Sequence, residues 1–331
     1  MLIATAGILS VHAFTRSRQI PPITSLWFLE DGRLHRLVAG STSVTSTQIT
    51  DNVGFILDVR HDLGKILFSS KPEGGATSLF GSLWIATQDG SVAEIYPVTD
   101  DSAISPDGTK IALVAKDEER VKILDLKGNV LQTIPGFGGG TVTWNHAGDQ
   151  LAYIKVVDPP CSSGEDLVFN SDRCRSGISI FNLKTETSEL ILKDGDADGP
   201  VAFTQDDQGL YFNSSKAYDE WPEAHIVSIW LLDLQNKQTR RLTNHFEGLG
   251  KGLIPTLNDA NTIWTSDGKM AISSRALEEG TWLFTFLPSG GLANVERLSD
   301  GDSPSWLVQD ATIAVRVIHN GTSSWQVVNI H

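Results

Sequence analysis

Short runs of apolar and β-branched residues alternate along most of the chain with clusters of Asp, Gly, Asn and Gln. The segment "TDDSAISPDGTKIALVA" at 99–115 shows the unit: polar residues lead into a short strand, a Ser-Pro-Asp-Gly turn follows, and a second, apolar strand comes after it. A helix could not tolerate turn residues at this spacing, so the pattern predicts a β-hairpin.

This hairpin recurs at intervals along the chain, and a second type of hairpin lies between its copies. The second type begins with an aromatic or aliphatic triplet, as in "SLWIATQDGSVAEIY". Two hairpins per repeat predict a four-stranded antiparallel sheet, and such sheets at a roughly constant period are typical of an all-β propeller. The first hairpin occupies 51–70, 99–115, 139–156, 197–215, 259–274 and 301–317, and the second 25–38, 82–96, 121–134, 178–192, 228–243 and 281–298.

The number of blades follows less directly from the pattern. Six copies of the first hairpin favour six blades, closed by pairing of the N-terminal and C-terminal strands, while a partial extra strand at 323–330 leaves seven as the alternative. Pairing of the terminal strands would remove exposed sheet edges. We therefore expect residues 21–331 to form a single β-propeller domain.

The phrases "SPDGTKIAL" and "ILDLKGNVLQTI", with the lead-in at 190–203, resemble the propeller repeats of the TolB family and of related WD-like propellers, including the non-catalytic domains of prolyl oligopeptidases. The resemblance covers about residues 24–331 and implies a propeller of six or seven blades. It further implies a stand-alone propeller, because the N-terminal α/β domain of TolB and the catalytic domain of the peptidases do not fit in the remaining residues. The motif specifies architecture and says little about function.

The N-terminal segment "MLIATAGILSVHAF" is apolar and ends near small residues, which predicts a signal peptide or short N-terminal segment over residues 1–20. Arg16 and Arg18 follow the apolar stretch instead of preceding it, so an ordinary β-strand of the first blade is the alternative. The stretch is too short to span a bilayer. We expect a periplasmic or extracellular protein, with a cytoplasmic location as the alternative.

Both cysteines lie in one insertion, at 158–177. A disulfide between Cys161 and Cys174 would close a surface loop and persist in an oxidising compartment. The alternative is a pair of free thiols. A zinc site is disfavoured because two cysteines at this spacing lack further ligands nearby.

The formal net charge is −14, which disfavours nucleic acid and anionic lipid as partners. Acidic residues recur just before the strands that a propeller places innermost, so they are expected around one mouth of the axial channel. A ring of carboxylates there would attract a cation or a basic partner surface, although Asp is also a common turn residue. The acidic positions are Asp51, Asp100, Asp101, Asp196, Asp198, Asp300 and Asp302, of which Asp100, Asp101, Asp300 and Asp302 are the predicted binding residues.

The segment "DGDADG" matches the first half of a calcium-binding loop. Asp194, Asp196 and Asp198 have the alternate spacing of such a loop, but Gln205 stands where the bidentate Glu would be expected. We therefore interpret the segment as a solvated acidic linker, with a calcium site at Asp194, Asp196 and Asp198 as the alternative; no other cofactor is expected.

A second insertion, at 214–228, contains Tyr218 and Trp221, which are suited either to partner recognition or to packing on a neighbouring blade. Nucleophile-elbow, metalloprotease and phosphate-loop motifs are absent from the sequence, and His61 and His146 are expected in turns. These features favour a monomeric, non-catalytic module that binds a protein or cell-envelope component. A metal-dependent hydrolase or lyase with its site at the propeller axis is the alternative.

Overall fold

The computed structural model describes the strands and most of the tight turns of the chain. Residues 1–24 lie outside the described part, and so does the predicted signal peptide. The described residues are 25–30, 33–39, 44–60, 63–71, 81–99, 101–115, 120–134, 141–156, 176–193, 197–204, 206–214, 228–241, 263–264, 269–274, 280–286, 292–299, 302–308, 312–319 and 322–329.

The described residues form strands in seven antiparallel sheets, five of four strands and two of three. The first sheets contain β1 (Ser25–Glu30), β2 (Arg33–Ala39) and β3 (Val44–Thr50); β4 (Val53–Arg60), β5 (Lys65–Ser70), β6 (Leu83–Thr87) and β7 (Val92–Tyr96); and β8 (Asp101–Ile104), β9 (Lys110–Ala115), β10 (Arg120–Asp125) and β11 (Val130–Ile134). The next two contain β12 (Val142–Trp144), β13 (Gln150–Val156), β14 (Ser176–Asn182) and β15 (Thr187–Leu192); and β16 (Ala197–Phe203), β17 (Gly209–Ser214), β18 (Ser228–Asp233) and β19 (Thr239–Arg241). The last two contain β20 (Ile263–Trp264), β21 (Lys269–Ser274), β22 (Gly280–Phe286) and β23 (Leu292–Ser299); and β24 (Asp302–Val308), β25 (Thr312–His319) and β26 (Thr322–Asn329).

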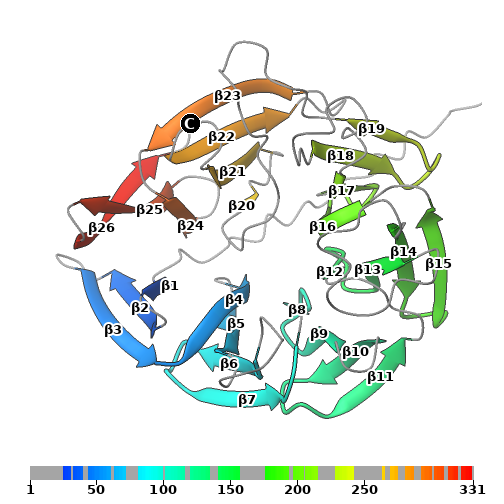
Figure 1. The fold of residues 1–331 in the computed structure, drawn as a ribbon. Coiled ribbons are helices and arrows are strands. Elements are labelled where there is room, and N and C mark those ends of the chain that lie inside the picture. The colour runs from blue at the N-terminus through cyan, green and yellow to red at the C-terminus, as the bar shows by residue number, and fades with distance from the viewer. Residues whose placement is uncertain are drawn as a thin grey trace, which may run out of the picture.

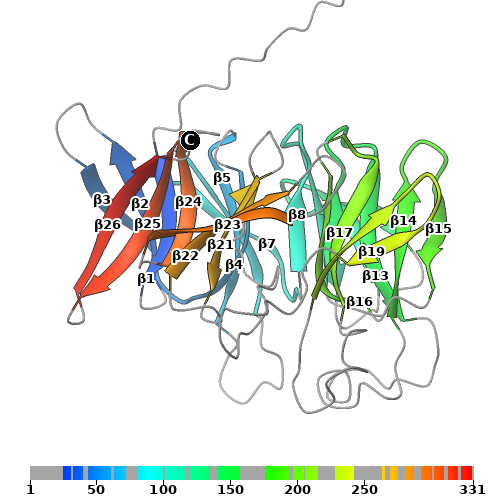
Figure 2. The ribbon, with the colours of Figure 1, turned by 90° about the horizontal axis from the view of Figure 1, so that it is seen from above.

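The sheets stand around a common centre, with β4, β8, β12 and β16 near the axis and β7, β11 and β15 at the rim (Figure 1). Figure 2 shows the ring from the side, with the strands running between its two faces. The predicted all-β propeller architecture is confirmed. In the part of the chain that the structure describes, no helix is long and apolar enough to cross a membrane.

The preferred number of six blades is not confirmed, because the described strands fall into seven sheets, the number of the alternative. The predicted pairing of N-terminal with C-terminal strands is not confirmed either. Strands β1–β3 and β24–β26 are two separate three-stranded sheets, and no ladder among the described residues joins one to the other. Whether terminal strands share a sheet depends on how the ring closes, which a repeat count does not fix.

The hydrophobic core is a series of layers between neighbouring sheets. In β9, Ile111 and Leu113 pack in the layer shared with β5–β7, whereas Ala112 and Val114 pack in the layer shared with β12–β14. All four side chains are fully buried. Successive residues of a strand point to opposite faces, so a sheet covered on both faces requires the continuous apolar run "IALV" in place of alternation.

Candidate functional site

Each of the four sheets from β4 to β19 has two edges that differ in their connections. The innermost strand begins at the edge that we call the loop edge, where Val53 pairs with Ser70 and Val142 lies opposite Tyr153 near the end of β13. It ends at the opposite edge, which we call the turn edge. Hydrogen bonds between neighbouring sheets join loop edge to loop edge and turn edge to turn edge, so each set of edges lies on one face of the ring.

Asp101 is the predicted binding residue whose side chain the structure describes. Its Oδ1 accepts a hydrogen bond from Ser102 N at 2.8 Å, and its Oδ2 accepts one from Val142 N, in the next sheet, at 3.0 Å. Burial raises the pKa of this carboxyl to about 7, with the Asp58 charge adding to the rise, while hydrogen bonds from Val142, Thr141 and Ser102 oppose it. Asp101 therefore links two sheets at the loop edge.

Asp58 makes a similar link one sheet earlier, but towards the turn edge, because it lies two residues before the end of β4 and its partner Ile104 is the last residue of β8. Its Oδ2 accepts a hydrogen bond from Ile104 N of β8 at 2.7 Å. Two neighbouring innermost strands thus each carry a carboxyl group that binds the backbone of the following one. Sequence reasoning missed Asp58, since it lies inside a strand and not in the polar lead-in.

Each of the two predicted insertions begins and ends at paired residues of the loop edge. Val156 and Ser176, which bracket residues 157–175, are opposite each other in the β13–β14 ladder. Ser176 Oγ donates a hydrogen bond to Ala197 O of the next sheet at 2.5 Å. Ala197 pairs with Ser214, the last described residue before the insertion at 215–227. Both insertions therefore start next to the edge that holds Asp101.

The insertion residues themselves, and most other predicted site residues, lie outside the described residues. Asp198 and Asp302 are described in the backbone alone, at the second residue of β16 and the first of β24. The second half of the possible calcium motif at 194–199 therefore lies in strand β16. Among the residues that the structure describes, no three His, Cys, Asp or Glu gather to hold a metal ion. The predicted residues outside the described part are Asp100, Asp194, Asp196, Asp300, Tyr218, Trp221, Cys161 and Cys174.

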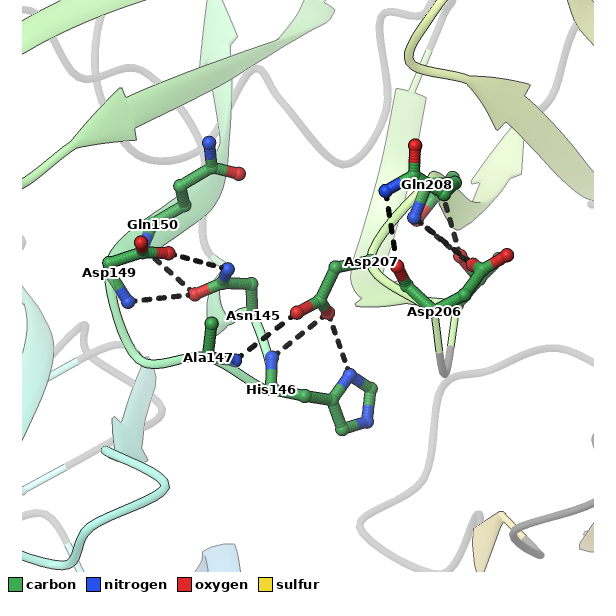
Figure 3. A network of polar contacts seen from close by, with 10 residues as sticks. Asn145, His146, Ala147, Asp149, Gln150, Asp206, Asp207 and Gln208 are labelled. Carbon is green, nitrogen blue, oxygen red and sulfur yellow. Dashed lines mark hydrogen bonds and ion pairs between the residues drawn. The ribbon is translucent and has the colours of Figure 1, made fainter. Parts of the chain in front are cut away.

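At the turn edge, a polar contact between sheets joins His146 and Asp207 (Figure 3). Asp207 Oδ1 accepts hydrogen bonds from His146 N at 2.9 Å and lies 2.8 Å from His146 Nδ1, and Asp207 Oδ2 accepts one from Ala147 N at 3.2 Å. His146 lies in the β12–β13 turn, as expected. One carboxylate thus binds the neighbouring turn at three points.

Asp207 occupies a backbone position that glycine fills in the two preceding sheets. Its φ is +57°, while Gly108 and Gly148 have φ values of +70° and +73°, and all three N–H groups bond to the carbonyl three residues earlier. The left-handed conformation costs a residue with a side chain about 1–2 kcal/mol. An acidic residue at a turn position that otherwise holds Gly is the sequence signal that could have identified this contact.

Replacing Asp207 by Ala is expected to lower the free energy of unfolding by about 2 kcal/mol, because three contacts are lost and the unfavourable φ is retained. Asp207→Gly is the matched control, which relieves the φ and should recover about 1 kcal/mol of that loss. Urea denaturation followed by circular dichroism measures both. Equal stabilities of the Ala variant and the unaltered protein would contradict the linking role.

Other turn carboxylates have a local role. Asp107 accepts hydrogen bonds from Ser105 Oγ at 2.6 Å and Thr109 N at 3.0 Å, and such bonds lower its pKa to about 2 despite some burial. Arg60 completes this turn from the preceding sheet, donating to Ser105 O and Pro106 O at 3.1 Å each. These groups stabilise the turns and their stacking.

Comparison with known proteins shows similarity of fold. No family model and no curated protein sequence matches the chain. Among solved structures, TolB from Acinetobacter baumannii is 16% identical, with a TM-score of 0.50 over 90% of this chain and 74% of that one. A putative TolB from Agrobacterium tumefaciens is 16% identical, with a TM-score of 0.51 over 87% and 94%. Hydrazine synthase from Kuenenia stuttgartiensis is 11% identical, with a TM-score of 0.58 over 97% and 99%. At identities this low, the similarity supports the propeller fold and no shared function.

Proposed function

We propose that this protein is a non-catalytic interaction module that binds a protein or cell-envelope component through the loop edge, the face of the ring with the long insertions. The observation that carries the proposal is the Ser176–Ala197 contact, which joins the end of the first long insertion to the strand pair from which the second begins. Rigid scaffolds commonly present recognition loops in this way. The fold similarity to two TolB structures is consistent with such a role.

Charge supports a basic partner surface. Between β4 and β19, the connections at the loop edge contain 14 acidic and 6 basic residues, and those at the turn edge contain 7 and 3. The net charge of the loop-edge connections is thus −8, against −4 for the turn-edge connections. Negative potential on one face attracts and orients a basic partner. We place this encounter in the periplasm or outside the cell.

Reversal of the charges at Asp100, Asp300 and Asp302 to Lys tests the proposal. Asp101 is left unchanged, because its carboxyl binds Val142 N and reversal there would also disturb the fold. The full chain is used to capture partners from native extract, with calcium and with chelator. We expect at least tenfold weaker capture of a stoichiometric envelope protein, equivalent to about 1.4 kcal/mol.

The matched control reverses three acidic residues away from the loop edge: Glu94 and Glu296 on outer strands, and Glu186 in a turn. All three are exposed. This variant carries the same change in net charge, so it should capture the partner within about twofold of the unaltered protein if the effect is local. Equal loss in both variants, or no loss in the first, would overturn the proposal. Dependence of capture on calcium would point to the segment at 194–198.

A further inference from the structure

The carboxyl group of Asp101, at the start of an innermost strand, points to a regulatory device at the loop edge. Asp58 binds β8, and Asp101 binds β12, each through a backbone N–H of the next strand. We propose that Asp101 is a proton-controlled link between sheets β8–β11 and β12–β15: the ionised carboxylate holds Val142 N–H, and protonation weakens that hydrogen bond. The biological use of the link rests on the proposed function, but the link can be tested without a partner.

Hydrogen-bond donors face both oxygens of Asp101. Ser102 N donates to Oδ1 and Val142 N to Oδ2, and the Thr141 side chain also bonds to the carboxyl. An ionised carboxylate accepts only, whereas a carboxylic acid carries a proton on one oxygen. Protonation removes the charge that strengthens these bonds and makes the protonated oxygen a poorer acceptor, so the hydrogen bonds to the carboxyl group weaken. The two protonation states therefore bind the next sheet differently.

The surroundings make both states accessible near neutral pH. Desolvation raises the pKa of Asp101 from 3.8 to about 7, and the like charge of Asp58 contributes to the rise. Bonds from Val142, Thr141 and Ser102 pull in the other direction without cancelling the burial. A change from pH 8 to pH 6 thus shifts the group from mostly ionised to mostly neutral.

The charged groups on the elements around β8 are few. From β4, Asp58 faces β8, while Arg60 binds the carbonyl groups of Ser105 and Pro106 at the turn edge. Lys110 of β9 also lies at the turn edge, where its carbonyl accepts from Ser105 N. The other titratable groups on these elements are Lys65 at the turn-edge start of β5, and Tyr153 and Lys155 of β13, of which Tyr153 lies opposite Val142 and bonds to Ser188 Oγ. β12 has none, and Asp100, next to β8, lies outside the described residues.

Weakening of the bond to Val142 N–H would act on the proposed binding face. Val142 pairs with Tyr153, four residues before the insertion at 157–175 begins. Loosening the start of β12 therefore changes the support of that insertion. The loop edge at Val142 would then differ between neutral and mildly acidic surroundings.

The test is nuclear magnetic resonance of the ¹⁵N-labelled full chain between pH 5 and pH 9. The Val142 amide signal, identified with a Val142→Ile variant, should titrate with a midpoint near 7. Its hydrogen exchange, corrected for the intrinsic pH dependence, should be about tenfold faster at pH 6 than at pH 8, matching the change in ionised fraction. Asp101→Asn should abolish both effects.

Asp58→Asn provides a second variant that keeps an acceptor for Ile104 N while removing the like charge. It should lower the midpoint at Val142, and Asp206→Asn at the turn edge should leave it unchanged. A midpoint of the Val142 titration below pH 5 in the unaltered protein would overturn the proposed link. So would a midpoint that is the same in Asp58→Asn as in the unaltered protein. Because no partner enters these measurements, their failure is distinct from failure of the capture experiment.

The sign of the stability effect gives an independent readout. A carboxyl whose folded-state pKa is raised favours folding most fully below pH 3.8, and this contribution is lost as the pH rises through about 7. The midpoint of urea unfolding should therefore fall between pH 5 and pH 8 more steeply in the unaltered protein than in Asp101→Asn. Identical slopes would contradict the assignment of the titration to Asp101.

Discussion

Replacement of Trp144 by Ala is expected to lower the free energy of unfolding by about 4 kcal/mol. Trp144 is 7% exposed and packs with Val142, Leu151 and Tyr153 in the layer between sheets β8–β11 and β12–β15. Its Nε1 also donates a hydrogen bond to Ala103 O at 3.0 Å, across the same layer. The substitution leaves a cavity where two sheets meet. Urea denaturation followed by far-ultraviolet circular dichroism measures the loss.

Trp144→Phe separates the two contributions. The smaller ring keeps much of the apolar contact and removes the N–H donor, so a loss of about 1–2 kcal/mol is expected. If Ala and Phe cost the same, the hydrogen bond and not the packing would dominate at this position. A cost below 1 kcal/mol for the Ala variant would contradict the described layer.

Gly128→Ala is expected to cost about 3 kcal/mol, because two penalties combine at one turn. Gly128 has a φ of +85°, which penalises a residue with a side chain by about 1–2 kcal/mol. A Cβ atom at this position would also lie 2.3 Å from the carbonyl oxygen of Ile95, in the neighbouring sheet. Backbone atoms cannot yield at low cost, so the two sheets must separate locally.

Gly90→Ala is the matched control, measured by the same urea denaturation. Gly90 has a φ of +89°, and a Cβ there would meet nothing within 4 Å. This variant should therefore lose only the conformational contribution, about 1 kcal/mol. Equal losses at the two glycines would show that the turn at Gly128 does not restrain the approach of its neighbour.

The Trp144→Ala and Gly128→Ala variants both test contacts between sheets, as do the variants at Asp101 and Asp207. Hydrogen bonds within a sheet hold each blade together, but the ring depends on what passes from one sheet to the next. The described contacts of this kind occur at the loop edge, in the apolar layers and at the turn edge. We expect substitutions at these positions to affect stability more than substitutions on exposed outer strands.

The sequence by itself determined the strands and their local pairing. Turn residues such as Asp107 and Gly108 fix a hairpin within a few positions, and the continuous apolar run in β9 indicated a strand covered on both faces. These are local properties, because a hairpin register follows from its turn and from the alternation of side chains. The all-β class and the propeller architecture could be predicted for that reason.

Only the tertiary structure decided which residues meet between sheets. Asp101 binds Val142 across 41 positions, and Asp207 binds His146 across 61. The acidic residues before the innermost strands look alike in sequence. Their pattern therefore predicted a common position at one mouth of the axial channel, but not the hydrogen bond between the Asp101 carboxyl and Val142 N of the next sheet. The number of sheets was also decided only by the tertiary structure. Ring closure depends on the angles between packed sheets, and these angles arise from side-chain packing over the whole ring. The period of the repeat does not fix them.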